Sequence, residues 1–338
     1  MNNAEQRILM AHGSGGKLSG ELFQQVFFPA FANPALAEVH DGARLTVAGG
    51  QLAFATDSYV VKPRFFPGGD IGKLAVCGTV NDLAMTGAEP LYLSAGFILE
   101  EGLAMAELRN VVESMRQAAA AAGVQIVTGD TKVVEKGAAD GLYINTAGIG
   151  RLLPAVDIRA GRVRSGQMVI LSGSLGDHGI AVMGERHGLT LPDTVISDCA
   201  PLNHMVRELL TEVPTVSWLR DPTRGGLAAA LNELAVQTGL GIMLEESELP
   251  VNPAVAAVCD ILGFDPLYLA NEGKLIAIVE NKDTEKVLAI LHRHPEGVAS
   301  RAIGRVAERP AAQVGIRTLV GGVRLLDMPT GDPLPRIC

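Results

Sequence analysis

Acidic residues stand at several points of this 338-residue sequence where strands or helices are expected to begin or end. Asp41 precedes an expected strand, and Asp57 closes the strand expected after it. Asp82 interrupts the otherwise apolar segment 74–85, where an unpaired carboxylate would be costly to bury. Asp221 lies in the stretch Arg-Asp-Pro-Thr-Arg-Gly-Gly. Oxygen donors of this kind suit Mg²⁺ and its phosphate ligands, although each acid taken alone could equally be a cap or turn residue.

A glycine-rich loop near the N-terminus is a candidate phosphate site. Residues 12–17 read His-Gly-Ser-Gly-Gly-Lys, and the backbone N–H groups of such a loop can wrap phosphate oxygens. The loop is not a Walker A motif, because Ala11 holds the position of its first glycine and Leu18 follows the lysine. On its own the segment is either a phosphate loop or an ordinary flexible loop.

Three further residues could carry acid–base or thiol chemistry. Lys132 follows Asp130, which ends the expected strand 124–128, and Glu272 lies in the turn Asn-Glu-Gly-Lys. Both residues could also be surface charges. Cys338 is the last residue, so it is either incidental on a frayed end or the thiol of a carrier arm.

The segment that ends in this cysteine is rich in proline. Residues 327–338 contain three prolines, which remove backbone donors and fix φ, so neither a helix nor a central strand fits. We expect an extended, flexible C-terminal tail, and about 12 stretched residues reach up to roughly 40 Å. Such a tail could bring its thiol into a distant pocket.

Strands and helices alternate in both halves of the chain, which predicts an α/β (α+β) fold with two domains. The segment 151–167 is poor in large apolar residues and is the expected boundary, so the domains span 1–155 and 156–326, followed by the tail. The expected helices cover 103–122, 178–187, 202–211 and 227–237. The expected strands cover 45–48, 52–55, 91–99, 124–128, 142–149, 168–171, 242–244, 275–279, 304–306 and 315–319.

Composition excludes several classes of function. The 28 basic residues are outnumbered by 37 acidic ones, which gives a net charge of −9 and argues against a nucleic-acid-binding surface, though not against a nucleotide held through Mg²⁺. No apolar run approaches the roughly 18–20 residues of a transmembrane helix, and the N-terminus does not read as a secretory signal. The four cysteines form no CxxC pair. We therefore expect a cytoplasmic protein with no membrane or nucleic-acid partner.

Several stretches together resemble a known family. They are residues 56–90, 128–137, 220–227, 271–275 and the terminal Pro-Arg-Ile-Cys, 335–338. They resemble the HypE family of hydrogenase maturation factors, within the ATP-binding superfamily of aminoimidazole ribonucleotide synthetase and selenide, water dikinase. The resemblance implies a two-domain PurM-like fold, in which the N-terminal domain forms a dimeric barrel and the C-terminal domain an α/β sandwich. It also implies a homodimer with ATP bound near the interface.

The resemblance implies a reaction as well. Members of the family carry a carbamoyl group on the terminal cysteine, here Cys338, after receiving it from a HypF-type carbamoyltransferase. They use ATP to dehydrate this S-carboxamide to an S-cyanate (thiocyanate), and the cyano group passes to the iron centre on HypC–HypD for [NiFe]-hydrogenase. Selenide, water dikinases carry Cys or selenocysteine in the glycine loop, whereas here no cysteine precedes Cys77, which argues against selenium chemistry.

Matching motif by motif gives the expected site residues. The ATP-binding residues implied by the resemblance are Gly15, Gly16, Lys17, Asp57, Asn81, Asp82 and Asp130. The residues implied for Mg²⁺ are Asp41, Asp57, Asp82 and Asp221.

A mechanism for the implied reaction needs a base. Transfer of the ATP γ-phosphoryl group to the carboxamide oxygen would make it a leaving group, and loss of the N–H protons would then give the nitrile. We expect Glu272 to accept a proton, with Lys132 beside it tuning that base or steadying the phosphorylated oxygen, and the two roles could be exchanged. Two alternatives remain: an ATP-dependent ligase or kinase of purine or thiamine synthesis, and a non-catalytic thiol carrier or scaffold.

Overall fold

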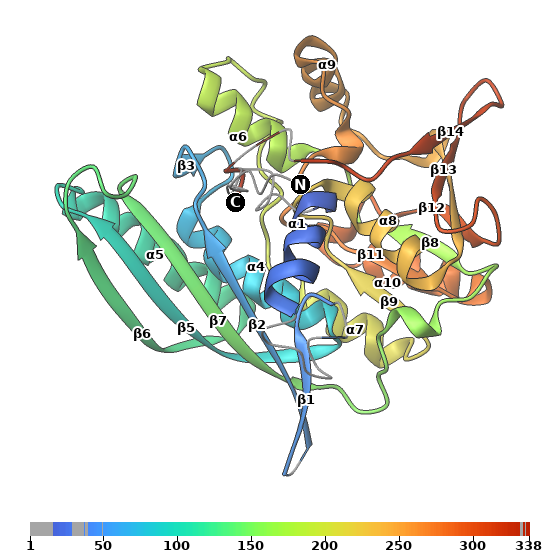
Figure 1. The fold of residues 1–338 in the computed structure, drawn as a ribbon, viewed down its shortest axis with the longest axis horizontal. Helices are drawn as coiled ribbons and strands as arrows, with labels where there is room; N and C mark the ends of the chain where they lie inside the picture. Colours follow the sequence, from blue (N-terminus) through green and yellow to red (C-terminus); the bar gives the residue numbers. More distant parts are fainter. Residues whose placement is uncertain (1–15, 29–36, 38–39, 49, 332–333, 335) are drawn as a thin grey trace, which may run out of the picture.

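The computed structural model describes residues 16–28, 37, 40–48, 50–331, 334 and 336–338. Two sheets lie on opposite sides of the molecule, and helices fill the space between and around them (Figure 1). The first described elements are the helix α1 (Gly16–Leu22) and the short π-helix η2 (Phe23–Phe27). None of the described helices combines the length and the apolar character that crossing a bilayer requires.

The first sheet has five strands in the order β1-β2-β7-β5-β6, and only the β5–β6 pair is parallel. Its strands are β1 (Ala43–Val47), β2 (Gly50–Tyr59), β5 (Ala88–Glu100), β6 (Gln125–Val134) and β7 (Leu142–Leu152). The helices α4 (Ile71–Met85) and α5 (Met105–Ala122) cover one face (Figure 1). Asp70 begins α4, because its carboxylate accepts the N–H groups of Gly72 at 2.7 Å and Lys73 at 3.2 Å.

The opposite face of this sheet is open and apolar. Phe54 pairs with Ile149, which pairs with Tyr92, so the three side chains form a row across neighbouring strands. Each is between 37% and 44% exposed, which is unusual for large apolar side chains in adjacent strands.

The second sheet has seven strands in the order β14-β13-β10-β12-β8-β11-β9. They are β8 (Met168–Leu171), β9 (Trp218–Arg220), β10 (Gly241–Glu245), β11 (Ile276–Val279), β12 (Arg301–Ala307), β13 (Val314–Arg317) and β14 (Val323–Leu326). Both faces are covered, since Ile276 and Ile278 belong to a cluster with α8 (Gly226–Thr238), whereas Ala277 and Val279 face α7 (Asn203–Glu212) and α10 (Thr284–Leu291). Two further helices, α6 (Asp177–His187) and α9 (Pro253–Leu262), pack on each other, and β3 (Phe65–Phe66) pairs with β4 (Gly69–Asp70).

Helix α4 joins the two halves of the core. It packs on the first sheet, while Ala84 and Met85 at its end belong to the cluster formed by α7, α10 and the second sheet. The helix is therefore buried nearly all round, and a polar side chain on it must face a cavity or a partner.

The expected elements are mostly present, with informative differences. The strand 168–171 is confirmed with the same bounds, and the helix expected at 103–122 begins two residues later. Asp130 does not end its strand as expected: β6 continues to Val134, because it pairs with β5 as far as Glu100. Likewise, β2 continues past Asp57 to Tyr59. The helices α9 and α10 and the strand β9 were not predicted.

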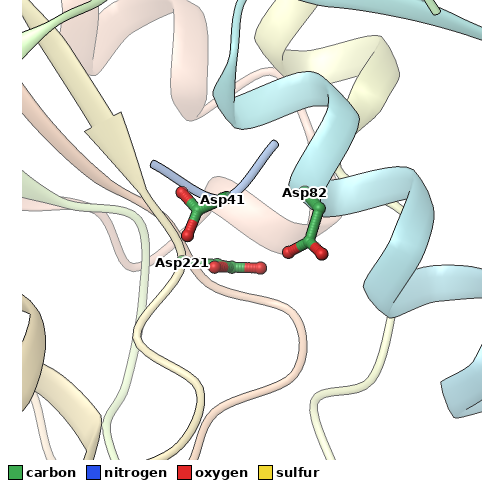
Figure 2. Close-up of side chains that lie close together, drawn as sticks. All are labelled: Asp41, Asp82 and Asp221. Carbon is green, nitrogen blue, oxygen red and sulfur yellow. The ribbon is translucent and has the colours of Figure 1, made fainter. Parts of the chain in front are cut away.

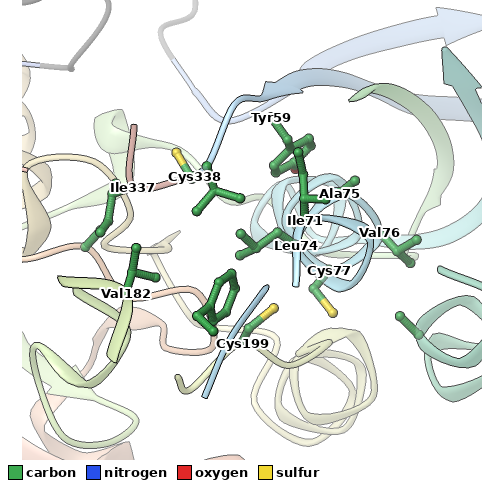
Figure 3. Close-up of a cluster of buried hydrophobic side chains, with 14 of the residues drawn as sticks. Tyr59, Ile71, Leu74, Ala75, Val76, Cys77, Val182, Cys199, Ile337 and Cys338 are labelled. Atoms are coloured by element: carbon green, nitrogen blue, oxygen red, sulfur yellow. The ribbon is translucent and has the colours of Figure 1, made fainter. Parts of the chain in front are cut away.

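The C-terminal tail returns to the centre of the molecule. Its described residues form neither helix nor strand, as expected, but Ile337 and Cys338 are only 1% and 8% exposed. Figure 3 shows them among apolar side chains of α4 and α6, including Leu74 and Val182. The tail therefore ends inside the protein in this structure.

Candidate functional site

A cavity of about 360 Å³ lies where the two sheets, α4 and the tail meet. Its walls are made of charged groups rather than apolar ones. They include four of the expected acids, the expected base and the terminal cysteine: Asp41, Asp57, Asp82, Asp221, Glu272 and Cys338. The structure thus brings together residues that are spread over nearly the whole sequence.

Three of the acids converge on one point. Asp41 precedes β1, Asp82 projects from α4, and Asp221 directly follows β9, and their carboxylates face one another in Figure 2. One oxygen of each lies within 4.8 Å of the others. Three hard oxygen ligands at this separation fit a divalent cation such as Mg²⁺.

The electrostatics of this group also favour a cation. Burial raises the pKa of Asp82 well above its usual value, and the charges of Asp221, Asp57 and Asp41 raise it further. Burial likewise raises the pKa of Asp221, to about 6. Among the described atoms, Oδ2 of Asp41 is buried without a hydrogen-bond partner. A bound cation would let all three carboxylates ionise and would supply the missing partner.

Two arginines offset part of the negative charge. Arg220 contacts Asp41 at 2.7 Å and Glu233 at 2.8 Å. Arg224 lies 3.6 Å from Asp57, and the negative charge of Cys338, followed by that of Asp57, raises its pKa. Arg224 is therefore the cation that faces the end of the tail.

Glu272 lies in the same cavity as the terminal cysteine. Its side chain is 3% exposed, and within the described part of the chain its Oε1 has no hydrogen-bond partner. Burial raises its pKa well above the usual value, and the charges of Asp221 and Asp198 act in the same direction. A carboxylate in this setting is a stronger base than an exposed glutamate.

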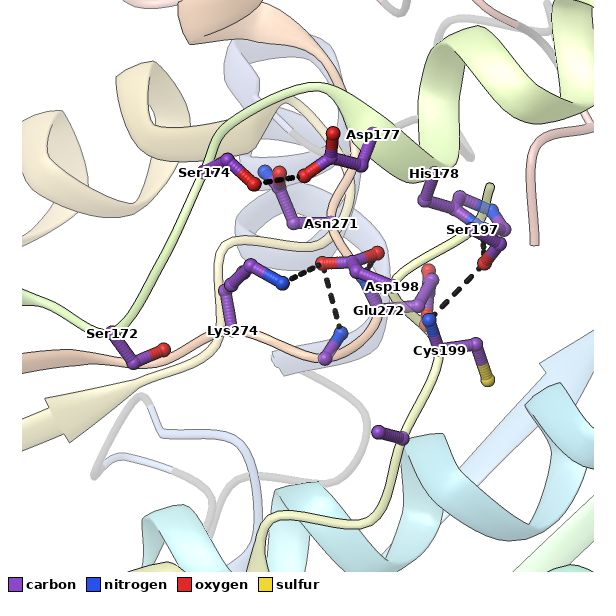
Figure 4. Close-up of polar contacts among 12 residues, drawn as sticks. Ser172, Ser174, Asp177, His178, Ser197, Asp198, Cys199, Asn271, Glu272 and Lys274 are labelled. Atoms are coloured by element: carbon purple, nitrogen blue, oxygen red, sulfur yellow. Dashed lines mark hydrogen bonds and ion pairs between the residues drawn. The ribbon is translucent and has the colours of Figure 1, made fainter. Parts of the chain in front are cut away.

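The backbone around Glu272 is fixed by Asp198 (Figure 4). The two oxygens of Asp198 accept the N–H of Glu272 at 3.0 Å and that of Gly273 at 3.3 Å. Lys274 pairs with the same carboxylate at 3.1 Å, and these two side chains are only 4% and 9% exposed. Gly273 is required here, because a Cβ atom would lie 1.8 Å from the carbonyl oxygen of Asp198.

Comparison with known proteins identifies the family. Residues 39–152 match the family described as AIR synthase related protein, N-terminal domain, and residues 164–317 match its C-terminal domain. The carbamoyl dehydratase HypE of Rhodobacter capsulatus is 50% identical over 339 residues, which cover 99% of each chain. The chain belongs to the HypE family. Its fold is accordingly the two-domain α/β fold of that family.

Two crystal structures of HypE proteins resemble the chain closely. One is a HypE in complex with ATP, which is 50% identical, with a TM-score of 0.83 and coverage of 98% of this chain and 100% of that one. The other is a HypE–HypF complex, which is 46% identical, with a TM-score of 0.87 and coverage of 91% of this chain and 99% of that one.

Some residues expected from the HypE resemblance lie elsewhere. Asp130 and Lys132 are on β6, 70% and 73% exposed, and pair with each other at 3.2 Å. They line a separate, mostly apolar cavity of about 330 Å³ together with Tyr143. The expectation that Lys132 lies beside Glu272 is therefore wrong within one chain, because β6 is an edge strand whose side chains point to solvent.

Of the expected glycine loop, the structure describes only Gly16 and Lys17, and Gly15 lies outside the described residues. The N–H of Lys17 donates to the carbonyl of Pro329 at 3.1 Å, and a Cβ atom on Gly16 would lie 2.3 Å from that same oxygen. The Lys17 side chain points outward toward Glu21, so these two residues contact the base of the tail and do not line the cavity.

Asn81, expected to bind ATP, has a structural role in this HypE-family chain. Its amide donates to the carbonyls of Ala200 at 3.0 Å and Glu272 at 3.4 Å and accepts the N–H of Leu202 at 2.8 Å. These bonds use both donors of the amide and tie α4 to the Glu272 turn.

Sequence reasoning missed several residues of the site. Arg220 and Arg224 flank Asp221 in the sequence but were assigned no role. Positive charges on either side of an acid that is expected to be buried indicate that they pair with buried acids. His40 lines the same cavity, and burial lowers its pKa to about 3, so it is neutral there. No pattern in the sequence pointed to Asp198, whose contacts are all with residues distant along the chain.

Proposed function

We propose that this chain is a carbamoyl dehydratase that uses ATP to convert an S-carboxamide on Cys338 into an S-cyanate for hydrogenase maturation. The observation that carries the proposal is the position of Cys338 in one cavity with Glu272 and the three convergent acids. A relative of 50% identity that binds ATP supports the choice of co-substrate.

The acids Asp41, Asp82 and Asp221 would hold Mg²⁺, with Asp57 nearby on the same wall. A magnesium ion in this position would neutralise triphosphate charge during phosphoryl transfer. Arg224 would orient the terminal residue through its charge, since its strongest electrostatic partner is Cys338.

In the proposed reaction, the carboxamide oxygen attacks the γ-phosphorus of ATP and ADP leaves. Glu272, as a carboxylate, takes one proton from the carboxamide nitrogen at Oε1, which is buried and has no partner among the described residues. The C–O bond then breaks, phosphate carries away the former carboxamide oxygen, and the second N–H proton is released. The product is S–C≡N on the sulfur of Cys338, and the lost water appears as the hydrolysis of ATP to ADP and phosphate.

The open face of the first sheet supports a homodimer in which the N-terminal domains close a barrel. The row Phe54, Ile149 and Tyr92 gives each chain a self-complementary apolar surface of the kind that C₂ dimers bury. Lys132 and Asp130, on the edge strand beside this face, would then act on nucleotide near the interface.

Partners follow from the relatives. A HypE of 46% identity forms a complex with HypF, so we infer that a HypF-type carbamoyltransferase loads Cys338. The cyano group would then pass to an iron centre on HypC–HypD.

The deciding experiment is intact mass of the protein after incubation with the carbamoyl donor system, followed by ATP. The expected result is the gain of one carbamoyl group on Cys338 and the loss of one water on adding ATP. Cys338→Ala should not load, while the control Cys259→Ser, at a buried cysteine outside the cavity, should load normally. Glu272→Ala should load but keep its water.

The alternatives give different results in the same experiment. A purine or thiamine kinase would keep its activity after removal of the last residues. A thiol carrier would load but never lose water. Either result would reject the dehydratase.

A further inference from the structure

The end of the tail is bound as a peptide ligand would be. The N–H of Val60 donates to an oxygen of the terminal carboxylate of Cys338 at 3.0 Å, and the N–H of Lys62 donates to the carbonyl of Arg336 at 3.1 Å. This alternation extends β2 with a short strand-like pairing, as in peptides that add to a sheet edge. Two side chains of α6 add further hydrogen bonds to the backbone of the same three residues.

His178, in the first turn of α6, contacts the tail directly. Its Nε2 lies 2.9 Å from the carbonyl oxygen of Ile337, and its Nδ1 lies 2.8 Å from Oγ of Ser197. Because a carbonyl can only accept, Nε2 must carry the proton, and Nδ1 must then accept from the Ser197 hydroxyl. The Ser197 oxygen in turn accepts the N–H of Cys199 at 3.1 Å, so each donor in this series of hydrogen bonds has an acceptor.

The environment keeps this histidine in its neutral form. The ring is fully buried and meets Phe66 edge-on at 5.4 Å between centroids. Burial lowers the pKa of His178, although the charge of Asp198 and the bond to Ile337 act against it. Ser197, which is hydrogen-bonded to His178, is directly followed in the sequence by Asp198, which fixes the Glu272 turn (Figure 4). The tail and the proposed base are thus held by neighbouring residues.

Arg186, in the last turn of the same helix, makes the second contact. Its Nη2 donates to the carbonyl of Arg336 at 2.8 Å, and its Nε donates to the carbonyl of Lys62 at 2.7 Å. The guanidinium therefore bridges the tail and the strand on which the tail lies. Helix α6 holds the tail from both of its ends.

We propose that His178 and Arg186 are positioning residues that recognise the backbone carbonyls of Ile337 and Arg336 and hold the Cys338 sulfur in the cavity. The inference rests on the proposed role of Cys338 as the carrier. Neither residue touches the reacting atoms, so their loss should release the tail without affecting the nucleotide site.

The test is the rate at which a small alkylating reagent modifies Cys338 in the unloaded, full-length protein, followed by peptide mapping. Loss of one hydrogen bond to the tail should weaken docking about fivefold. Because docked and free tails are similarly populated, this should raise the alkylation rate about twofold in Arg186→Met and in His178→Phe. His178→Gln, which keeps a donor near the position of Nε2, should stay close to the wild type. Arg305→Met, which replaces an exposed arginine on β12, is the matched control and should change nothing. Equal rates in wild type, Arg186→Met and His178→Phe would overturn the proposal.

A second measurement separates positioning from general damage. In single turnovers of carbamoylated protein over a range of ATP concentrations, Arg186→Met should lower the dehydration rate at saturating ATP about threefold, with no change in the KM for ATP. A raised KM would assign Arg186 to nucleotide binding and refute the inference. If even the wild type fails to dehydrate while the alkylation rates differ as expected, the docking site stands and the proposed function falls. Arg186 is half-buried on the surface, so its variant tests the proposal even if His178→Phe does not fold.

Discussion

Replacing Asp198 with asparagine tests how the site holds its proposed base. Asp198 accepts two backbone N–H groups from the Glu272 turn and pairs with Lys274 at 3.1 Å, and these side chains are nearly excluded from water. Asparagine has the same shape, but one of its oxygens becomes an NH₂ group. In one orientation of the amide that group would face the N–H of Glu272, and in the other it would face the donors of both Gly273 and Lys274.

The cost follows from the burial of the pair. Removing one partner of a buried ion pair leaves the other charge uncompensated, which typically costs about 3–5 kcal/mol of the free energy of unfolding. Because Lys274 is only 9% exposed, solvent does not screen this loss effectively. The turn must also shift to separate two facing donors, and a displacement of about 1 Å at the proposed base would lower kcat about a hundredfold.

Three measurements check this reasoning. Urea unfolding should show the loss of stability in Asp198→Asn, and adding Lys274→Met should restore most of it, because no charge is then left unpaired. Dehydration should remain slow in the double variant. A loss of less than about 1 kcal/mol in the single variant would mean that the pair is not closed as described.

The pH dependence gives an independent check with a definite sign. Glu272 must be ionised to accept a proton, so kcat should fall as the pH drops through its pKa, which burial and the charges of Asp221 and Asp198 raise. Removing the charge of Asp198 lowers that pKa, and the acidic limb of the profile should move to lower pH. A limb that stays in place, or moves upward, would contradict the role of Asp198.

Other variants test the cation site and the open sheet. Without Mg²⁺, Asp82→Asn should raise the midpoint of thermal unfolding, because it relieves repulsion among buried carboxylates. With Mg²⁺, the variant should lack the further rise in this midpoint that the wild type gains, and calorimetry measures both effects. Tyr92→Glu should leave the circular dichroism spectrum unchanged but shift the sedimentation coefficient toward that of a monomer, because it places a charge in the apolar row. Gly273→Ala should cost several kcal/mol in urea unfolding, since its Cβ would overlap the carbonyl of Asp198.

The sequence indicated the acids of the proposed cation site better than the surroundings of the proposed base. Each acid alone could be a cap or turn residue, and the resemblance singled out Asp41, Asp57, Asp82 and Asp221, of which Asp41, Asp82 and Asp221 converge in the structure. Asp82 was the clearest case, since α4 is buried nearly all round. Periodicity likewise placed α5 to within two residues.

Lys132 shows where local pattern fails. It follows Asp130 and lies near glycine, as Glu272 does, and this similarity suggested a shared site. The position of Lys132 relative to Glu272 depends on which strand lies at the sheet edge. The order in which strands pair is a property of the whole fold. The contacts of Asn81 were unreadable for a related reason, because its partners Ala200 and Leu202 are about 120 residues away along the chain.

The docked tail raises a requirement that the proposed reaction must meet. Cys338 is 8% exposed when docked, so a carbamoyltransferase can reach it only when the tail has left the cavity. At least six hydrogen bonds hold the last three residues, two of them from the Arg336 side chain to Val60 and Asp140, at about 1 kcal/mol each, and burial of Ile337 adds about 2 kcal/mol. Ordering three residues costs about 1–2 kcal/mol each, besides the side-chain entropy of Arg336 and Ile337.

These opposing contributions are of similar size, so the docked and free tails should both be populated. A docking equilibrium near balance allows both reactions, because carbamoyl loading needs the free tail and dehydration needs the docked tail. Changes that strengthen the dock should therefore slow loading as they speed dehydration. A single docking equilibrium requires opposite effects on the two rates. When each rate is expressed as a fraction of its maximum, the two fractions should sum to the same value across a series of α6 variants.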